Sequence, residues 1–318
     1  CCPFHEEKTP SFVVSPQKAI FHCFGCGAGG NVLTFIKDYE GLNFVEAVEK
    51  LAELNNVTVP REKNFGNDNF TKMHEINDIV ANYYFDALKK PKQKSIVQYL
   101  KERGISGQTA KNFKIGFADF NQNALLKVLQ SKFSEKEILE SGSFLKNDKG
   151  FYPFLRNRVT FPIFNSSGKT IGFGGRVTDD SMPKYLNSKD SKFFNKTREL
   201  YGFNNAKKDH KTEDFIVTEG YMDVVMLSEY GINNAVASLG TAFSQNHMSS
   251  MFKLRRKITF CFDSDEAGLK AAWRALQISL KHVIDDKTVR FLFLPEGYDP
   301  DSFVKEKGEQ EFYKKLDR

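Results

Sequence analysis

The sequence predicts a multidomain protein with both α+β and α/β parts: a small metal-binding domain, a linker, a mixed α+β subdomain with a basic surface, and a parallel-sheet α/β subdomain with a helical tail. Three observations predict this. Four of the five cysteines lie within the first 26 residues, an aperiodic stretch follows near residue 60, and apolar strands alternate with helices from residue 214 onward. The 318 residues suffice for two or three domains and at least one sizeable core.

The expected domain boundaries follow from changes in composition and periodicity. The stretch PREKNFGNDNF, at residues 60 to 70, contains Pro, Gly, Asn and mixed charge without periodicity, which is typical of a linker. We therefore expect a metal-binding domain, a linker, a basic subdomain, a parallel-sheet subdomain and the start of a C-terminal helical segment, over residues 1–60, 61–70, 71–212, 213–301 and 302–318.

The amino-terminal domain is expected to contain two strands and then two helices, over residues 11–14, 20–24, 32–39 and 44–54. Asn43 directly precedes the second helix, and Glu46 lies three residues later, which is an N-cap pattern.

The basic subdomain is expected to begin with a long helix, because apolar side chains recur at helical spacing from Met73 until Pro91. Shorter helices should follow, over residues 95–102, 122–131 and 135–141. The stretch RVTFPIFNSSGKTIGFGGRV, at residues 158 to 177, predicts two strands around an Asn-Ser-Ser-Gly turn.

Beyond residue 214 the pattern predicts a mostly parallel sheet that is covered on both faces. Strands are expected over residues 215–220, 235–240, 257–263 and 288–295, and helices over residues 221–231, 245–253 and 266–280. In such sheets, ligands bind beyond the carboxyl ends of the strands. Trp273 and Cys261 lie in apolar patterns, so we expect both in the core.

Charge is unevenly distributed along the chain. Residues 151–198 contain nine Lys or Arg against three Asp, whereas residues 213–301 contain thirteen acidic against nine basic residues. A basic tract beside an acidic one is consistent with a polyanion bound next to a metal site, although two ordinary solvated faces explain the counts more simply. No apolar stretch approaches the roughly 20 residues of a membrane span, so no membrane partner is expected.

Two pairs of metal-ligating residues flank a gap of seventeen residues: Cys2 with His5, and Cys23 with Cys26. Three thiolates and one imidazole suit one tetrahedral Zn²⁺, and a closed set of four protein ligands indicates a structural ion. Clustered cysteines of this kind favour a metal site in a reducing compartment over a disulfide framework. Cys1 could replace Cys2, and His22 could compete with Cys23. The two-residue spacing favours Cys2, and His22 would point to the opposite side of a strand from Cys23.

Three acidic clusters follow predicted strands: Glu219 with Asp223, Asp263 with Asp265, and Asp299 with Asp301. A parallel sheet would bring them to one edge, where like charges demand a cation. Oxygen ligands of high charge density suit Mg²⁺ or Mn²⁺. For one cluster alone, capping or surface placement is simpler, and Asp265 could be an N-cap. Three clusters in register instead favour metal-assisted phosphoryl chemistry.

Together these motifs resemble those of the bacterial DnaG-type primases. EGYMD at residues 219–223, DSD at 263–265 and DPD at 299–301 resemble the Toprim metal-binding fold. CPFHEEKTPSF and FHCFGCGAGGNV precede them, and GFGGRV and PKYLNS lie between, in the order of that family. The resemblance implies a zinc-ribbon domain joined to an RNA polymerase domain, which would synthesise short RNA primers on single-stranded DNA from ribonucleoside triphosphates.

The resemblance also implies individual roles. Glu219 looks like the catalytic glutamate, and Asp263 would act with it in catalysis. The catalytic Mg²⁺ or Mn²⁺ would be bound by Glu219, Asp223, Asp263, Asp265, Asp299 and Asp301. Template and nucleotide would be bound by a basic surface formed by Arg103, Arg176, Lys184, Tyr185, Asn187 and Lys196. Tyr185 could stack a base, and a half-buried tyrosine is an equally good explanation.

The partners expected from the resemblance are single-stranded DNA and ribonucleoside triphosphates. A replicative helicase is expected for the full-length protein, through a C-terminal domain that this sequence does not include, and the expected location is the cytoplasmic bacterial replisome. Two other hypotheses are a Toprim nuclease or topoisomerase, and a non-catalytic module that binds single-stranded DNA. The full carboxylate set speaks against the latter, since a scaffold has no need of negative charge beside DNA.

Overall fold

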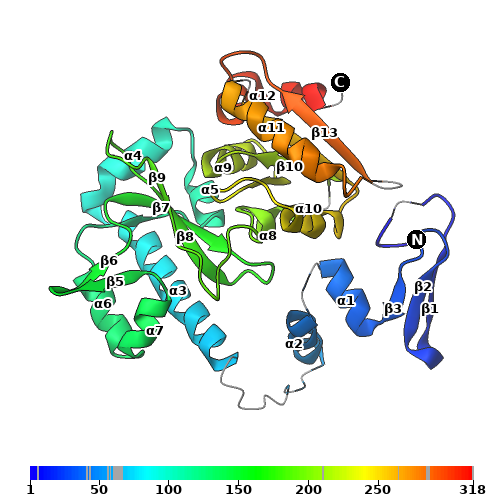
Figure 1. The fold of residues 1–318 in the computed structure, drawn as a ribbon, viewed down its shortest axis with the longest axis horizontal. Helices are drawn as coiled ribbons and strands as arrows, with labels where there is room; N and C mark the ends of the chain where they lie inside the picture. Colours follow the sequence, from blue (N-terminus) through cyan, green and yellow to red (C-terminus); the bar gives the residue numbers. More distant parts are fainter. Residues whose placement is uncertain are drawn as a thin grey trace.

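The computed structural model describes residues 1–5, 7–40, 42, 44–55, 57, 59, 67–209, 211–263, 265–283 and 287–316. Its fold class is the predicted one: a small amino-terminal domain lies at one side of the molecule, and the basic and parallel-sheet subdomains pack against each other (Figure 1). The predicted cap Asn43 and linker residues 60–66 lie outside the described residues.

The amino-terminal domain is built on a three-stranded antiparallel sheet, in the order β1 (Phe12–Ser15), β2 (Ile20–Cys23) and β3 (Gly29–Asn31). A short 3-10 turn, η1 (Pro16–Lys18), joins the first two strands, and α1 (Val32–Glu40) and α2 (Phe44–Leu54) follow the third. Phe4, Phe12, Phe21 and Phe35 form a cluster with ring centroids 5.3 to 6.3 Å apart. So small a core needs a bound metal to make the domain stable.

The basic subdomain begins with the long helix α3 (Asn67–Leu88), so residues 67–70 of the predicted linker are helical. It continues with η2 (Pro91–Gln93), α4 (Lys94–Glu102), α5 (Gly107–Asn112), α6 (Asn123–Gln130) and α7 (Glu135–Glu140). Its main sheet is antiparallel, in the order β4 (Gly116–Ala118), β7 (Arg158–Phe164), β8 (Thr170–Arg176) and β9 (Tyr185–Asn187). A separate hairpin consists of β5 (Phe144–Asn147) and β6 (Gly150–Pro153).

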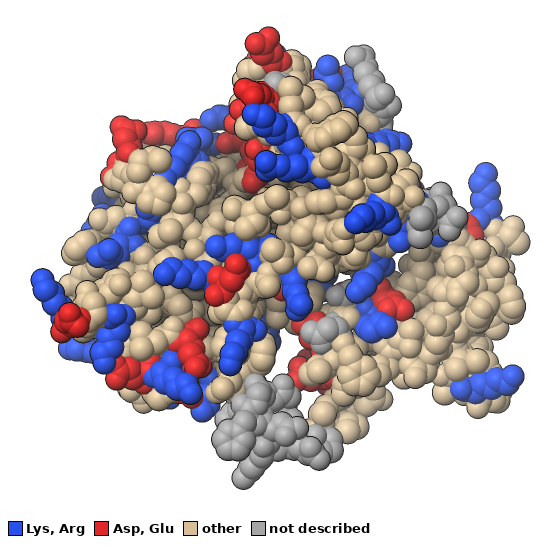
Figure 2. Space-filling view, in the orientation of Figure 1, with Lys and Arg blue, Asp and Glu red and all other residues tan. Residues whose placement is uncertain are grey.

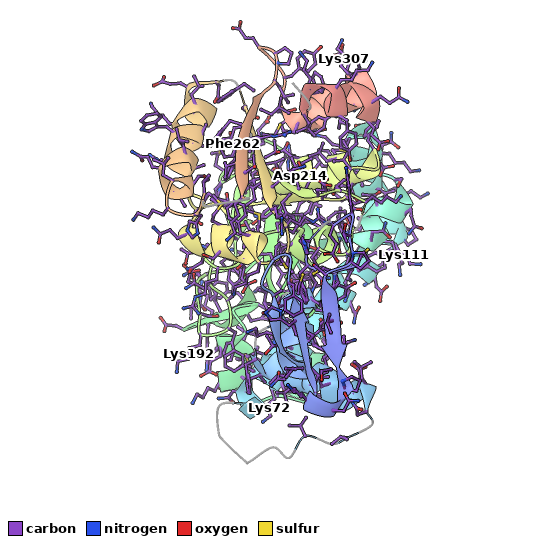
Figure 3. The ribbon with its side chains drawn as sticks, turned by 90° about the vertical axis from the view of Figure 1, so that its right-hand side faces the viewer. Lys72, Lys111, Lys192, Asp214, Phe262 and Lys307 are labelled. Carbon is purple, nitrogen blue, oxygen red and sulfur yellow. The ribbon has the colours of Figure 1, made fainter. Side chains whose placement is uncertain are left out.

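The second large sheet is parallel, as predicted, in the order β11 (Ala235–Ala237), β10 (Asp214–Thr218), β12 (Lys257–Phe262) and β13 (Thr288–Phe293). Its helices are α9 (Tyr221–Glu229), α10 (Gln245–Phe252), α11 (Glu266–Ser279) and α12 (Pro300–Leu316). In Figure 3, Asp214 marks the first residue of β10 and Phe262 the last residue of β12. Parallel pairing places all four carboxyl ends at one edge of the sheet.

Alternating side chains of β10 show that the parallel sheet is covered on both faces. Phe215 and Val217 belong to a buried cluster with residues of α10 and α11. Ile216, between them, belongs to a second cluster with residues of α9 and α12. A strand that is buried on both sides reads as a continuous apolar run, which is why its sequence predicted the parallel sheet.

The two subdomains are joined by backbone as well as by side chains. Tyr201, just before the short helix α8 (Phe203–Ala206), exchanges two backbone hydrogen bonds with Ala237 of β11, of 2.8 and 3.0 Å. The Tyr221 ring of α9 lies over β8, against Gly174, where a methyl group would stand 2.5 Å from the ring. Only glycine therefore allows this contact, which brings the ends of β8 and β9 next to the carboxyl edge of the parallel sheet.

One core prediction is wrong. Trp273 is 62% exposed, on the outer face of α11, with Leu269 exposed one turn earlier. The apolar pattern of α11 was correct for helix formation, but it does not distinguish the inner face, where Ala272 and Ala275 lie, from the outer one. Cys261 is buried as predicted. In the described part of the chain, none of the helices combines the length and apolar character needed to cross a membrane.

Candidate metal centres and active-site cleft

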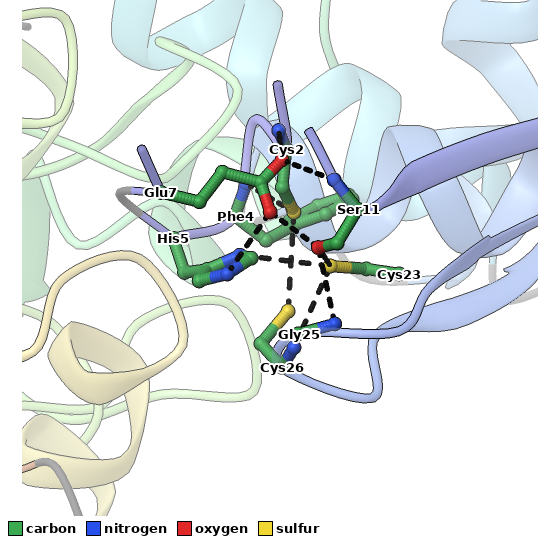
Figure 4. A network of polar contacts seen from close by, with 8 residues as sticks. All are labelled: Cys2, Phe4, His5, Glu7, Ser11, Cys23, Gly25 and Cys26. Carbon is green, nitrogen blue, oxygen red and sulfur yellow. Dashed lines mark hydrogen bonds and ion pairs between the residues drawn. The ribbon is translucent and has the colours of Figure 1, made fainter. Parts of the chain in front are cut away.

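The four predicted zinc ligands, Cys2, His5, Cys23 and Cys26, come together in the amino-terminal domain, with ligand atoms within 4.8 Å of one another (Figure 4). The sulfurs of Cys2 and Cys26 are 3.9 Å apart, and the Cys23 sulfur lies 3.6 Å from His5 Nδ1. Around a tetrahedral Zn²⁺ with ordinary bond lengths, two sulfur ligands lie about 3.8 Å apart, and a sulfur and a nitrogen ligand lie about 3.6 Å apart. The residues therefore fit one zinc ion, and Cys1 lies outside the group.

The two buried cysteines of this group differ in acidity. Burial raises the pKa of Cys2 to about 11. Burial also opposes ionisation of Cys23, but the contact with the Ser11 side chain and hydrogen bonds from the amides of Cys26 and Gly25 lower its pKa to about 6. Donors aimed at a sulfur favour the thiolate, which is the form that binds zinc.

The acidic residues follow the carboxyl ends of the parallel strands. Glu219 follows β10, Asp263 follows β12, and Asp223 lies in the first turn of α9. With Asp299 and Asp301, at the start of α12, they form one wall of a cleft of about 370 Å³. In the view of Figure 2, acidic side chains are seen in the recess between the two subdomains. The register of the sheet thus brings together clusters far apart in sequence, as predicted.

Gly268 shapes the turn that carries Asp263. A methyl group at Gly268 would stand 2.0 Å from the Asp263 carbonyl oxygen, so only glycine lets α11 begin this close to the end of β12. The backbone amide of Asp263 in turn donates to Glu219 Oε1, at 3.3 Å. The two residues assigned to catalysis are therefore linked by backbone geometry as well as by strand pairing.

Burial and mutual repulsion raise the pKa of the carboxyl groups that line the cleft. The pKa of Asp223 is well above its ordinary value, chiefly because the side chain is buried. Burial, and then the charge of Glu219, raise the pKa of Asp263 to about 6. The pKa values of Glu219 and Asp301 are also raised, again chiefly by burial. A divalent cation among these groups would offset the repulsion and displace their protons.

Asp265 is an N-cap, the simpler of the two roles predicted for it. It is exposed, and its side chain accepts a 2.7 Å hydrogen bond from the Gly268 amide as the N-cap of α11. β12 ends at Phe262, so neither Asp263 nor Asp265 belongs to the strand. Asp265 is absent from the described lining of the cleft.

The spacing of the carboxylates suits a hydrated ion. In the described part of the chain, the zinc-type cluster is the one group with three or more possible ligand atoms within 4.8 Å of one another. Mg²⁺ is usually bound by one or two carboxylates, with retained waters and substrate phosphates completing its shell. The acidic wall fits that kind of site rather than a cage of protein ligands.

The opposite wall of the cleft is basic and comes from the other subdomain. Arg103, at the end of α4, Arg176, at the end of β8, and Lys184 all line it. Arg176 is only 5% exposed, and its Nε has no hydrogen-bond partner among the described residues. Arg103 Nη1 lies 3.9 Å from Asp301 Oδ2, across the cleft. The cleft therefore presents cationic donors to an anion that is held against the acidic wall.

An aromatic side chain that sequence reasoning missed holds two of these arginines. The guanidinium carbons of Arg103 and Arg176 lie 5.8 and 6.0 Å from the centre of the Tyr99 ring. Arg176 also lies 5.3 Å from the Tyr185 ring. Guanidinium groups are attracted to aromatic faces at these distances. Tyr99 belongs to the apolar face of α4, so its sequence context indicated only a core residue.

The chain matches three family models in sequence order: a CHC2 zinc finger over residues 1–67, the N-terminal domain of the DNA primase catalytic core over 83–207, and a Toprim-like domain over 216–304. It is 48% identical to a DNA primase of Pseudomonas aeruginosa and 41% identical to one of Escherichia coli, across 98% and 100% of this chain. Those alignments cover 49% and 56% of the relatives, so the chain spans about half the length of the curated relatives it matches.

Solved structures give the same result. A DnaG primase catalytic domain bound to single-stranded DNA is similar with a TM-score of 0.74 and 38% identity, over 79% of this chain and 82% of that one. The chain belongs to the DnaG primase family. The Aquifex aeolicus primase structure with zinc-binding and RNA polymerase domains is similar with a TM-score of 0.73 and 37% identity, over 99% and 77%. Membership shows a zinc-ribbon site for one Zn²⁺ and a Toprim site for a divalent metal.

Two residues of the predicted DnaG-type basic surface have structural contacts of their own. Asn187 accepts a hydrogen bond from the Tyr221 hydroxyl and donates one of 3.0 Å to the Leu239 carbonyl, which ties β9 to the parallel-sheet subdomain. Tyr185 is half-buried, and burial raises its pKa to about 12. Both line the cleft, where they support its shape as well as its surface.

Lys196 is outside the described lining of the cleft. Its backbone carbonyl faces His247 Nε2 at 3.0 Å, and the neighbouring Thr197 carbonyl accepts a 2.5 Å hydrogen bond from Ser244. The start of α10 therefore fixes this loop. Conversely, Ser238 and Gly240 do line the cleft, and sequence reasoning did not name them. They follow β11, so the same strand-end rule that indicated Glu219 and Asp263 would have found them.

Proposed function

We propose that this chain is a DNA-directed RNA polymerase of the primase type, which synthesises short RNA primers on single-stranded DNA from ribonucleoside triphosphates. One observation carries the proposal: five carboxylates from the parallel-sheet subdomain and three cationic side chains from the basic subdomain line one cleft. A nucleoside triphosphate with its divalent cation matches that charge distribution, because the cation pairs with the acidic wall and the phosphates with the basic one.

The reaction would be attack of one nucleotide's 3′-hydroxyl on the α-phosphate of the next, with pyrophosphate as the leaving group. Bound Mg²⁺ or Mn²⁺ would stabilise negative charge on the phosphates, held by Glu219, Asp223, Asp263, Asp299 and Asp301. Glu219 would accept the proton of the attacking hydroxyl, and its raised pKa brings it closer to the working pH of a general base. Arg103 and Arg176 would orient the triphosphate.

The other assignments from the family are part of the same proposal. Single-stranded DNA would be the template, in keeping with the similar catalytic domain that is bound to it. The zinc domain would be a second, tethered DNA contact that raises the effective concentration of template at the cleft. Lys196 would belong to the same template-binding surface, and Asp265 would contact the hydrated ion from outside the cleft lining. The full-length protein would contact the replicative helicase in the cytoplasmic replisome of a bacterium.

The test is a synthesis assay with labelled ribonucleotides, a single-stranded template and Mg²⁺ or Mn²⁺. We expect new oligoribonucleotides from the unaltered chain and none from Asp263→Ala. Asp148→Ala is the matched control, because Asp148 is an exposed carboxylate in the β5–β6 turn. Nicked or relaxed DNA without RNA synthesis would favour a nuclease or topoisomerase instead. DNA binding without any chemistry would reduce the chain to a binding module.

A further inference from the structure

A buried carboxylate that is not a zinc ligand lies beside the zinc site. The Glu7 side chain is 7% exposed. Its Oε1 accepts hydrogen bonds from the backbone amides of Cys2, at 2.7 Å, and Ser11, at 3.0 Å. Its Oε2 accepts a hydrogen bond from the Ser11 hydroxyl. Figure 4 shows these contacts converging on one side of the four ligands.

The contacts of Glu7 reach three of the four ligands. Glu7 Oε2 lies 3.5 Å from His5 Nε2, while Nδ1 of the same ring faces the Cys23 sulfur. The Ser11 hydroxyl lies 3.2 Å from that sulfur and also accepts a 3.1 Å hydrogen bond from the Gly25 amide. Cys2 is reached through its backbone amide. A single carboxylate thus bears on the imidazole and on two of the cysteines.

We propose that Glu7, together with Ser11, is the positioning pair of the zinc site. Glu7 faces Nε2 of His5 and so keeps Nδ1 directed at the metal, and by accepting the Ser11 proton it fixes the Ser11 side chain beside the Cys23 sulfur. A ligating histidine whose other nitrogen faces a carboxylate is held in one orientation and is a better donor. Glu7 does not bind zinc itself, because the four ligands complete a tetrahedral shell.

A purely local role would be different. Glu7 also accepts a hydrogen bond from the backbone amide of Ser11, so its role could be only to stabilise the chain between His5 and β1. In that case Glu7 would affect the folding of the turn, but not the strength or geometry of zinc coordination once the domain is folded. Zinc affinity and the spectrum of a substituted metal distinguish the two roles.

The experiment uses the full chain with Glu7→Gln, which removes the charge and keeps the shape, and Ser11→Ala. Glu53→Gln is the matched control, because that side chain is 77% exposed on α2 of the same domain. Zinc affinity is measured by competition with a chromogenic chelator, and coordination geometry by absorption of the Co²⁺-substituted protein. We expect Glu7→Gln to lower zinc affinity about 10- to 100-fold and to shift the Co²⁺ bands. Glu53→Gln should change neither.

The outcomes separate cleanly. One zinc per chain at saturating zinc, with weakened affinity and shifted Co²⁺ bands in Glu7→Gln, supports the positioning role. Unchanged affinity and bands would overturn it, as would a variant that takes up no zinc even at saturation, since Glu7 would then be required for folding. If Glu7 acts through Ser11, the double variant should lose less affinity than the sum of the two single losses. None of these readouts depends on polymerase activity.

Discussion

Replacing Gly174 with alanine should damage the cleft, although Gly174 itself does not line it. The added methyl group would stand 2.5, 2.9 and 3.2 Å from three carbon atoms of the Tyr221 ring. Carbon atoms in contact lie about 3.5–4.0 Å apart, so the ring must move by about 1 Å. The ring has little room to move, because it is stacked on the Phe161 ring and packed edge-on against the Tyr201 ring. The ring centroids are 5.7 and 4.7 Å apart, respectively.

The expected cost follows from this geometry. Overpacking of a well-filled core typically destabilises a protein by about 1–3 kcal/mol. At roughly 2–4 °C per kcal/mol for a domain of this size, the main melting transition should fall by about 2–12 °C. Moving Tyr221 also disturbs its hydrogen bond to Asn187, so primer synthesis at a permissive temperature should fall as well. Zinc content should not change, since the amino-terminal domain is not involved.

Gly107→Ala is the matched control for this substitution. Nothing lies within 4 Å of a methyl group at that position, and the residue begins α5 with ordinary helical backbone. Alanine there should stabilise the chain by about 0.4–1 kcal/mol, because the unfolded chain loses freedom. Calorimetry and the synthesis assay decide the matter. If Gly174→Ala melts and polymerises like the unaltered protein, the close approach of Tyr221 to β8 is not what shapes the cleft.

Three further predictions concern the metal sites and the arginines. Cys26→Ser should lose zinc, by metal analysis, and unfold the amino-terminal domain while the main melting transition stays in place. Tyr99→Leu should raise the KM for nucleotide severalfold, because each arginine loses a cation–π contact of about 0.5–1 kcal/mol, whereas Tyr99→Phe should change it little. Mn²⁺ affinity measured by calorimetry should fall about tenfold from pH 7 to pH 5, because a proton competes for Asp263 below its pKa of about 6.

Each of these three predictions would be contradicted by a specific result. Full zinc content in Cys26→Ser would contradict the ligand set. Equal effects of Tyr99→Leu and Tyr99→Phe would mean that the hydroxyl group, and not the ring face, matters. For Asp263 the sign is fixed: its pKa is raised above the ordinary value of 3.8, so the metal-free site holds a proton up to about pH 6. Tighter Mn²⁺ binding at pH 5 than at pH 7 would therefore exclude Asp263 as a ligand.

The sequence was informative where a local pattern determines the structure. The continuous apolar run of β12, followed at once by Asp263, predicted both the parallel sheet and the edge at which its carboxylates meet. The zinc ligands were found in the same way, because ligand type and spacing are local. The extent of α3 could not be read, since its first turn contains residues 67–70, whose Asn and Asp are as typical of a loop as of a helix start.

Contacts between distant segments could not be predicted in this way. Asn187 lies in a basic stretch and was assigned to nucleotide binding, but its amide joins β9 to the loop after β11, fifty-two residues further on. The contact of Tyr99 with the arginines could not be predicted, because Tyr99 lies on an ordinary apolar helix face. The contacts of Glu7 could not be predicted either, because Glu7 lies in a charged stretch between two zinc ligands. For such residues, the partner lies on another element, and nothing in the neighbouring sequence indicates it.

The backbone bridge between Tyr201 and Ala237 has a mechanical consequence. A hinge needs a segment whose torsion angles can change without breaking hydrogen bonds or a core, and here the chain between the two walls of the cleft does neither freely. We therefore expect the two walls to keep a fixed distance from each other. We expect a nucleotide or a growing strand to enter and leave this cleft without a change in its width.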